Sequence, residues 1–223
     1  MMDFEAARVK MVENQIRTTD VTSHSVLNAF LAVPREAFVP EKSKPLAYID
    51  TDVQIAPAAA GKQARFLMEA SPLAKLLQLG AIGKEDAVLE IGAGTGYTSA
   101  LLSHLAASVV AVECDEALAG EARQTLSSLG CANVSVVVGD LAKGHAAGAP
   151  YDVIFINGSV EQVPAGLLAQ LRDGGRLLAV QGYGNAACAE VFLRDGDTFS
   201  QSTFFNASVK PLPGFDKAKE FVF

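Results

Sequence analysis

The amino-acid sequence predicts an α/β protein with a doubly wound, mostly parallel sheet, a helical N-terminal extension and an antiparallel C-terminal finish. Two patterns carry this prediction. Short, nearly continuous apolar segments alternate with helical segments from residue 87 onward, which is typical of a parallel sheet covered on both faces. A glycine-rich loop follows the first of these apolar segments, at a position where open α/β sheets bind ligands.

The first third of the chain reads as mainly helical. Apolar residues at helical spacing predict three helices, near residues 9–16, 26–33 and 66–79. The third helix is expected to stop at Gly80 and Gly83. A loop-rich stretch over residues 40–61 precedes it, with an extended piece near Val53 and Ile55.

Strands and helices alternate in the rest of the chain. Apolar runs predict strands at residues 88–91, 109–112, 134–138, 152–156 and 176–180. Helices are predicted between them at residues 97–106, 116–129 and 164–171. Two late strands, at 191–193 and 203–209, are expected to form a hairpin that turns at Asp195 and Gly196.

Composition and residue patterns indicate which kinds of partner and which cellular compartment to expect. The formal net charge of −7 argues against nucleic acid as the main partner, because such binding needs clustered Lys and Arg. No apolar leader or membrane-spanning stretch is apparent, so we expect a cytoplasmic protein with no membrane partner. Cys114, Cys131 and Cys188 lack zinc-like spacing, and we expect no metal site.

The strongest chemical signal is the loop after the strand at 88–91. Gly92, Gly94 and Gly96 let the backbone approach a ligand closely. The dinucleotide fingerprint needs G-x-G-x-x-G, whereas position 97 is Tyr, so a nicotinamide-dependent oxidoreductase fits poorly. Glu90, two residues before the first glycine, completes a pattern typical of S-adenosylmethionine binders, where it can receive the methionine ammonium. The alternative is an ordinary strand-to-helix turn.

Two further carboxylates end the next two strands. Glu113 follows the strand at 109–112 and is placed to accept hydrogen bonds from both ribose hydroxyls of a nucleoside. Asp140 follows the strand at 134–138 and is placed to face the adenine amino group. Either residue alone could be a helix cap. Three such features in order on successive strands favour a cofactor site.

Nearly the whole chain resembles the protein-L-isoaspartate O-methyltransferase family. The matching segments are Met11 to Arg17, Val33 to Pro40, Ala47 to Asp50, Leu89 to Tyr97, Leu129 to Val134, Gly139-Asp140 and Gln170 to Arg176. The resemblance implies a Rossmann-like fold of the class I methyltransferases, in one domain over residues 1–223. Residues 1–80 would form a helical substrate-lid segment, and residues 81–223 the S-adenosylmethionine-binding core.

The resemblance also implies an activity and a set of binding residues. Family members transfer a methyl group from S-adenosylmethionine to the free α-carboxylate of isoaspartyl residues in damaged peptides and proteins, which promotes repair. The cofactor-binding residues carried over are Glu90, Gly92, Ala93, Gly94, Gly96, Tyr97, Glu113, Cys114, Asp140, Leu141 and Asn157.

One family segment is altered. The family has Gly-Gln-Thr-Ile-Ser-x-Pro before the cofactor strand, and the matching stretch at 61–67 puts Arg65 at the serine and Leu67 at the proline. Arg65 could bind a substrate carboxylate, although a tight ion pair would weaken that carboxylate as a nucleophile. We favour the alternative, a solvated arginine at a helix start. Asn157 could contact cofactor or substrate, or cap the next segment.

The altered segment leaves alternatives to isoaspartyl repair open. A diverged methyltransferase could act on another acceptor. A protein of another class could keep the cofactor site and serve as a non-catalytic sensor or scaffold. Turnover of an isoaspartyl peptide would distinguish isoaspartyl repair from both alternatives.

Overall fold

The computed structural model describes residues 2–215. The predicted single domain of 1–223 therefore includes residue 1 and residues 216–223, which lie outside the described residues. The helices are α1 (Phe4–Met11), α2 (His24–Ala32), α3 (Ala70–Gly80), α4 (Tyr97–Ser103), α5 (Glu116–Ser128) and α6 (Ala165–Leu168). The strands are β1 (Val53–Ala56), β2 (Arg65–Leu67), β3 (Ala87–Ile91), β4 (Ser108–Glu113), β5 (Val134–Val138), β6 (Tyr151–Val160), β7 (Leu171–Gln181), β8 (Cys188–Asp195) and β9 (Thr198–Asn206).

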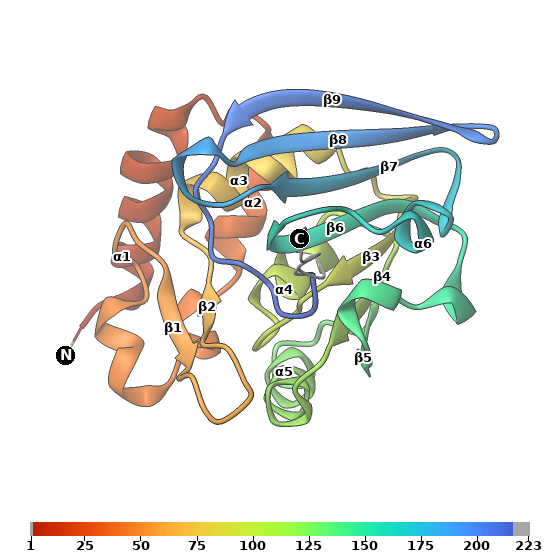
Figure 1. The fold of residues 1–223 in the computed structure, drawn as a ribbon. Coiled ribbons are helices and arrows are strands. Elements are labelled where there is room, and N and C mark those ends of the chain that lie inside the picture. The colour runs from red at the N-terminus through yellow and green to blue at the C-terminus, as the bar shows by residue number, and fades with distance from the viewer. Residues whose placement is uncertain (1, 216–223) are drawn as a thin grey trace.

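Seven strands form one sheet in the order β5-β4-β3-β6-β7-β8-β9 (Figure 1). Pairing is parallel from β5 to β7 and antiparallel for β8 and β9. The strand order reverses between β3 and β6, which makes the carboxyl ends of these strands the topological switch point where such sheets bind ligands. The predicted doubly wound sheet with an antiparallel end is confirmed, including the turn at Asp195 and Gly196.

Alternation along the strands divides the core between the two faces of the sheet. Val88 of β3 and Val153 of β6 belong to a cluster that contains residues of α2, α3 and α4. Their neighbours Leu89 and Ile154 belong to a second cluster with Leu167 of α6. Since side chains alternate with a period of two, a parallel strand covered on both faces must be apolar at nearly every position.

A buried arginine ties the N-terminal segments together. Arg35 follows α2 and is fully buried. Its Nε donates to the Ala47 carbonyl at 2.7 Å, and its Nη2 donates to the Met68 carbonyl at 2.8 Å. The guanidinium lies over the ring of Tyr97, 4.8 Å from the centroid. The Val-Pro-Arg motif thus holds the chain before α3 against the start of α4.

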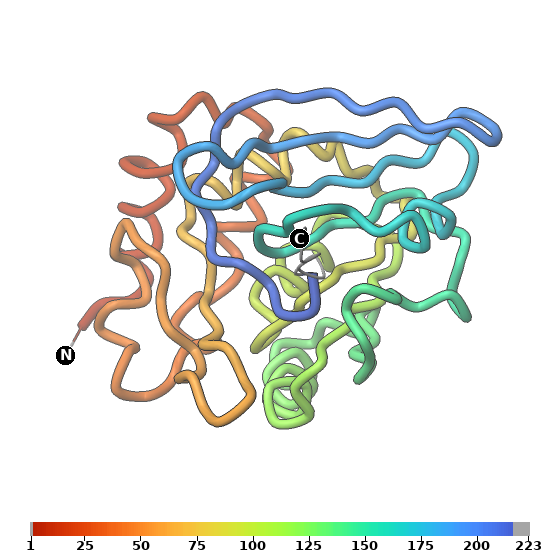
Figure 2. Tube along the Cα trace, in the orientation of Figure 1, coloured from red at the N-terminus to blue at the C-terminus, as the bar shows by residue number. Residues whose placement is uncertain are grey.

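The helix predicted over residues 66–79 is wrong at its beginning. Residues Arg65–Leu67 form β2, which pairs antiparallel with β1, and α3 begins only at Ala70. Arg65 and Leu67 are buried while Phe66 between them is less so, which is the period of a strand. The helix predicted over 164–171 is also shorter, because Leu171 already belongs to β7. The tube in Figure 2 shows the β1–β2 hairpin beside the sheet, at the end where α5 lies.

Residues 207–215, here called the C-terminal strap, return across the carboxyl ends of β3 and β6. The Ser159 amide of β6 donates to the Lys210 carbonyl, and the Leu212 amide donates to the Ser159 carbonyl. Leu212 and Phe215 are buried in the second core cluster. In Figures 1 and 2 this segment runs in front of the central strands.

Among residues 2–215, every helix is too short or too polar to cross a lipid bilayer.

Candidate active site

The glycine loop between β3 and α4 is closed against the end of β4. The amides of Gly92 and Ala93 both donate to the Val112 carbonyl, at 2.9 and 3.2 Å. Gly92 and Gly94 have φ angles of +89° and +58°, a region that favours glycine. A Cβ atom on Gly92 would lie 2.7 Å from a methyl group of Leu212. The loop therefore requires glycine both for its conformation and for the approach of the C-terminal strap.

Glu113 ends β4 with a fully buried carboxylate. Its Oε2 accepts from the Gly94 amide at 2.7 Å. Its Oε1 accepts from the amides of Cys114 and Asp115, at 2.9 and 3.0 Å. Three backbone donors from the glycine loop and the turn after β4 thus hold the Glu113 carboxylate at the end of β4, beside the switch point.

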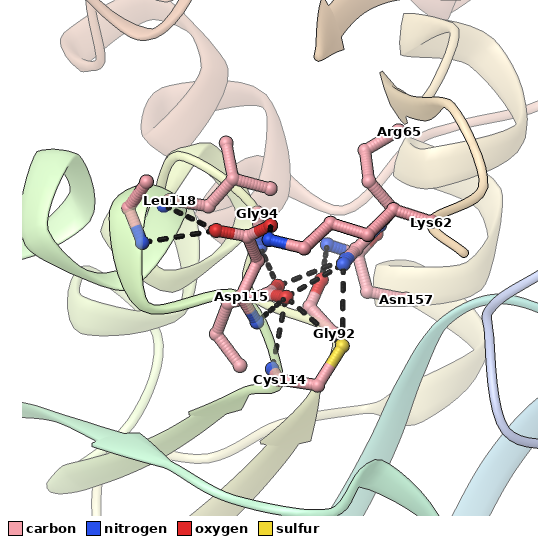
Figure 3. Close-up of polar contacts among 10 residues, drawn as sticks. Lys62, Arg65, Gly92, Gly94, Cys114, Asp115, Leu118 and Asn157 are labelled. Carbon is pink, nitrogen blue, oxygen red and sulfur yellow. Dashed lines mark hydrogen bonds and ion pairs between the residues drawn. The ribbon is translucent and has the colours of Figure 1, made fainter. Parts of the chain in front are cut away.

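The arginine of the altered segment lies on this carboxylate. Arg65 Nη1 donates to Glu113 Oε1 at 2.6 Å, and Nη2 donates to Oε2 at 2.9 Å. Burial by itself lowers the pKa of Arg65, but the hydrogen bond and charge of Glu113 outweigh it and leave this pKa above its ordinary value. Figure 3 shows Arg65 and Lys62 reaching from the β1–β2 hairpin toward Cys114 and Asp115, and Lys62 Nζ pairs with Asp115 at 2.6 Å.

The interpretation of Arg65 as a solvated residue at a helix start is therefore wrong. The side chain is 8% exposed, lies in β2, and pairs with Glu113 across 48 residues of sequence.

Glu90 is a second buried carboxyl group, at the end of β3. Its Oε2 accepts from Ser99 Oγ at 2.5 Å, and its Oε1 accepts from Asn157 Nδ2 at 3.1 Å. Burial raises the pKa of Glu90 to about 7, with the hydrogen bonds from Ser99 and Asn157 opposing the rise. Ser99 and Asn157 are both neutral, so this group is suited to receive a cation.

Asn157 lies within β6 and does not cap a segment. Besides Glu90, its Nδ2 contacts the Gly92 carbonyl at 3.3 Å, so it joins the glycine loop to the neighbouring strand. Ser99, which sequence reasoning missed, could have been found as a polar residue ahead of the apolar run from Ala100 to Leu102 in α4.

Other predicted cofactor residues occupy different surroundings. The Tyr97 side chain points into the first core cluster, where its ring contacts Phe38, so only its backbone remains near the loop. Leu141 is buried in the second cluster. Asp140 caps a short 3₁₀ turn by accepting from the Ala142 amide, which is the capping alternative raised for it. It still lies beside Glu113, because the Gly139 amide donates to the Glu113 carbonyl.

A cleft of about 300 Å³ opens beside the Arg65–Glu113 pair. It is lined by residues 61–63 and Arg65 of the hairpin, by Cys114 and Asp115 after β4, and by residues 213–214 of the C-terminal strap. Burial and the charge of Glu113 raise the pKa of the Cys114 thiol, so this cysteine is not activated. Among residues 2–215, no group of His, Cys, Asp and Glu side chains is placed to hold a metal ion.

Comparisons with known proteins decide the family. The sequence pattern described as protein-L-isoaspartate(D-aspartate) O-methyltransferase matches residues 6–211. The chain belongs to this family. Protein-L-isoaspartate O-methyltransferases of Koribacter versatilis and a Roseiflexus species are 34% and 36% identical to it. Those alignments cover 95% and 96% of this chain, and 92% and 94% of the relatives.

Solved structures agree with the fold. A protein-L-isoaspartate O-methyltransferase with 27% identity superposes with a TM-score of 0.82, over 93% of this chain and 66% of that one. A Plasmodium falciparum protein, solved in complex with S-adenosyl-L-homocysteine, has 15% identity and a TM-score of 0.75, which supports the fold alone. The predicted family, fold and cofactor are confirmed: the chain is an S-adenosylmethionine-dependent methyltransferase.

The donor set fits this cofactor. Glu90 is a buried carboxyl group with neutral partners, as an ammonium group requires. Glu113 is a buried carboxylate at the end of the adjacent strand, as a ribose diol requires. The two acids flank a glycine loop at the topological switch point.

Proposed function

We propose that this chain methylates the free α-carboxylate of isoaspartyl residues in peptides and proteins. The main support for this proposal is the pair of buried carboxyl groups, Glu90 and Glu113, that flank the glycine loop in a chain matching the isoaspartyl family over residues 6–211. Residues 1–80 would then supply the segment that faces the acceptor.

The proposed cofactor contacts follow the chemistry of each group. Glu90 would hold the methionine ammonium, and Glu113 the ribose hydroxyls. Asp140 and Leu141 would border the adenine. When bound, S-adenosylmethionine supplies an electrophilic methyl group on a positively charged sulfur.

The protein would act on this reaction mainly by placement. A carboxylate acceptor is already ionised at neutral pH, so no general base is needed. The hairpin and the C-terminal strap line the cleft and would reduce the water around the acceptor oxygen. Alignment of that oxygen with the methyl group then supplies the rate enhancement. Replacement of the family serine by Arg65 would be compatible with this scheme, because no step needs a hydroxyl group.

The test is methyl transfer from labelled S-adenosylmethionine to a synthetic isoaspartyl peptide, with the aspartyl isomer as the matched control. Transfer to the isoaspartyl peptide alone supports the proposal. Failure of transfer in folded protein that binds S-adenosylhomocysteine would reject this acceptor. Labelling of cell extract would then separate an enzyme with another acceptor from a non-catalytic cofactor-binding protein.

A further inference from the structure

Arg65 and a nucleoside diol require the same positions on Glu113. A carboxylate offers about four hydrogen-bonding positions on its two oxygens. The amides of Gly94, Cys114 and Asp115 already donate to Glu113, and the Arg65 fork adds one donor to each oxygen. A ribose held by this carboxylate through both hydroxyls would also place one donor on each oxygen. With the three amides and the Arg65 fork, Glu113 already accepts five hydrogen bonds, so its two oxygens have no free position for a second pair of donors.

We propose that Arg65 is an internal occupant of the ribose position, that the cofactor displaces it, and that the displaced guanidinium binds the carboxylate of the acceptor. This inference rests on the proposed function. It makes Arg65 the residue that links cofactor binding to recognition of an acidic acceptor.

The geometry indicates which donor leaves. The Cys114 and Asp115 amides follow Glu113 directly in the chain, and the Gly94 amide belongs to the loop that is closed against β4. These three donors are fixed by the fold of the core. Arg65 comes from β2, which belongs to a separate two-stranded sheet. Its long side chain can move without moving the loop.

The displaced guanidinium needs a new anion. Its side chain is 8% exposed, and a buried charge without a partner is strongly unfavourable. The only other cation among the described residues that line the cleft is Lys62, which Asp115 already neutralises at 2.6 Å. Displacement of Arg65 from Glu113 therefore leaves the positive charge of Arg65 in the cleft without an anionic partner.

An acceptor carboxylate meets this requirement. The guanidinium fork matches the two oxygens of a carboxylate. An oxygen that accepts one hydrogen bond keeps a second lone pair, which remains able to attack the methyl group. In this scheme the cofactor binds first, and the acceptor position becomes positively charged only afterwards.

The first arm of the test uses no acceptor. Calorimetry with S-adenosylhomocysteine would compare the wild type with Arg65→Met, which removes both the charge and the donors. Arg17→Met is the matched control, because Arg17 forms an exposed pair with Glu13. We expect Arg65→Met to bind about tenfold more tightly or better, the lower range for couplings between close charge pairs. Arg17→Met should bind as the wild type does. Unchanged or weaker binding by Arg65→Met overturns the displacement. Arg65→Lys, which keeps the charge without the fork, serves if Arg65→Met does not fold.

The second arm titrates an isoaspartyl peptide with and without saturating S-adenosylhomocysteine. In the wild type, peptide affinity should rise by about tenfold or more when the site is filled, because the guanidinium has been released. Arg65→Met should lose this gain while still binding S-adenosylhomocysteine. If it keeps the gain, Arg65 is not the acceptor ligand. If the wild type binds no isoaspartyl peptide in either state, the proposed function and the acceptor role both fail, and the first arm still decides the displacement.

Discussion

Replacing Glu90 by glutamine should stabilise the protein, and the gain should depend on pH. Glutamine has nearly the same shape as glutamate. Its carbonyl oxygen can accept from Asn157, and its amide can donate to the Ser99 oxygen. The exchange therefore keeps both contacts and removes only the buried ionisable group.

The expected gain follows from the raised pKa. Burial moves the pKa of Glu90 from 4.5 to about 7, and the gap corresponds to about 3 kcal/mol between the two protonation states. Between these pH values the native state binds more protons than the unfolded state, so wild-type stability falls as pH rises. The advantage of Glu90→Gln should thus be under about 1 kcal/mol at pH 5 and about 3 kcal/mol at pH 8.

Thermal unfolding across this pH range would measure the effect. For a chain of this size, about 3 kcal/mol raises the melting temperature by roughly 6 to 12 °C. Glu121→Gln, on the exposed side of α5, is the control and should show no such pH-dependent gain. An equal change in melting temperature at pH 5 and pH 8 for Glu90→Gln would refute the argument. The variant should also bind S-adenosylhomocysteine less tightly at pH 8, since the proposed partner of the ammonium is lost.

Three further predictions concern the loop and its supports. Gly94→Ala should lower the melting temperature by about 2 to 8 °C, because a positive φ costs a non-glycine residue about 1–2 kcal/mol. Gly120→Ala in the open face of α5 should instead leave it equal or higher. Arg35→Met should lose about 2 to 4 kcal/mol in urea unfolding, because two buried carbonyl groups lose their donor; an unchanged urea midpoint would contradict this. Asn157→Ala should move the pKa of Glu90 above 7, because a hydrogen bond that opposes the rise is lost. The gain in stability from Glu90→Gln should then have its pH midpoint at a higher pH in the Asn157→Ala background than in the wild type. An unchanged midpoint would show that Asn157 does not lower the pKa of Glu90.

Sequence patterns located the parallel core well, because its strands are short apolar runs with fixed neighbours. The strand at 134–138 matches from end to end, and the one predicted at 109–112 extends by one residue at each side. The apolar run from Phe66 to Met68 was misassigned, because a short apolar run fits a helix or a strand equally well. Pairing with β1 makes this segment a strand, and residues outside the segment supply that pairing.

The sequence predicts the acidic residues of the site but not the side chains that bind them. Glu90 and Glu113 stand beside a glycine loop, so their positions follow from the order of strand, loop and helix. The Arg65–Glu113 pair joins two sheets across 48 residues, and no local sequence pattern predicts it. Asp140 shows the reverse case, since a residue that follows a strand can cap the next turn as readily as contact a ligand.

The C-terminal strap gives the site an order of assembly during synthesis. Leu212 packs over Gly92, and residues 213–214 line the cleft, yet the glycine loop and both acids are translated long before them. Domains generally fold as units while the chain emerges. A nascent chain that ends before residue 212 therefore carries the loop and its carboxyl groups without the wall that encloses them. We therefore expect the cofactor to bind, and to stabilise the folded chain, only after residues 212–214 have been translated.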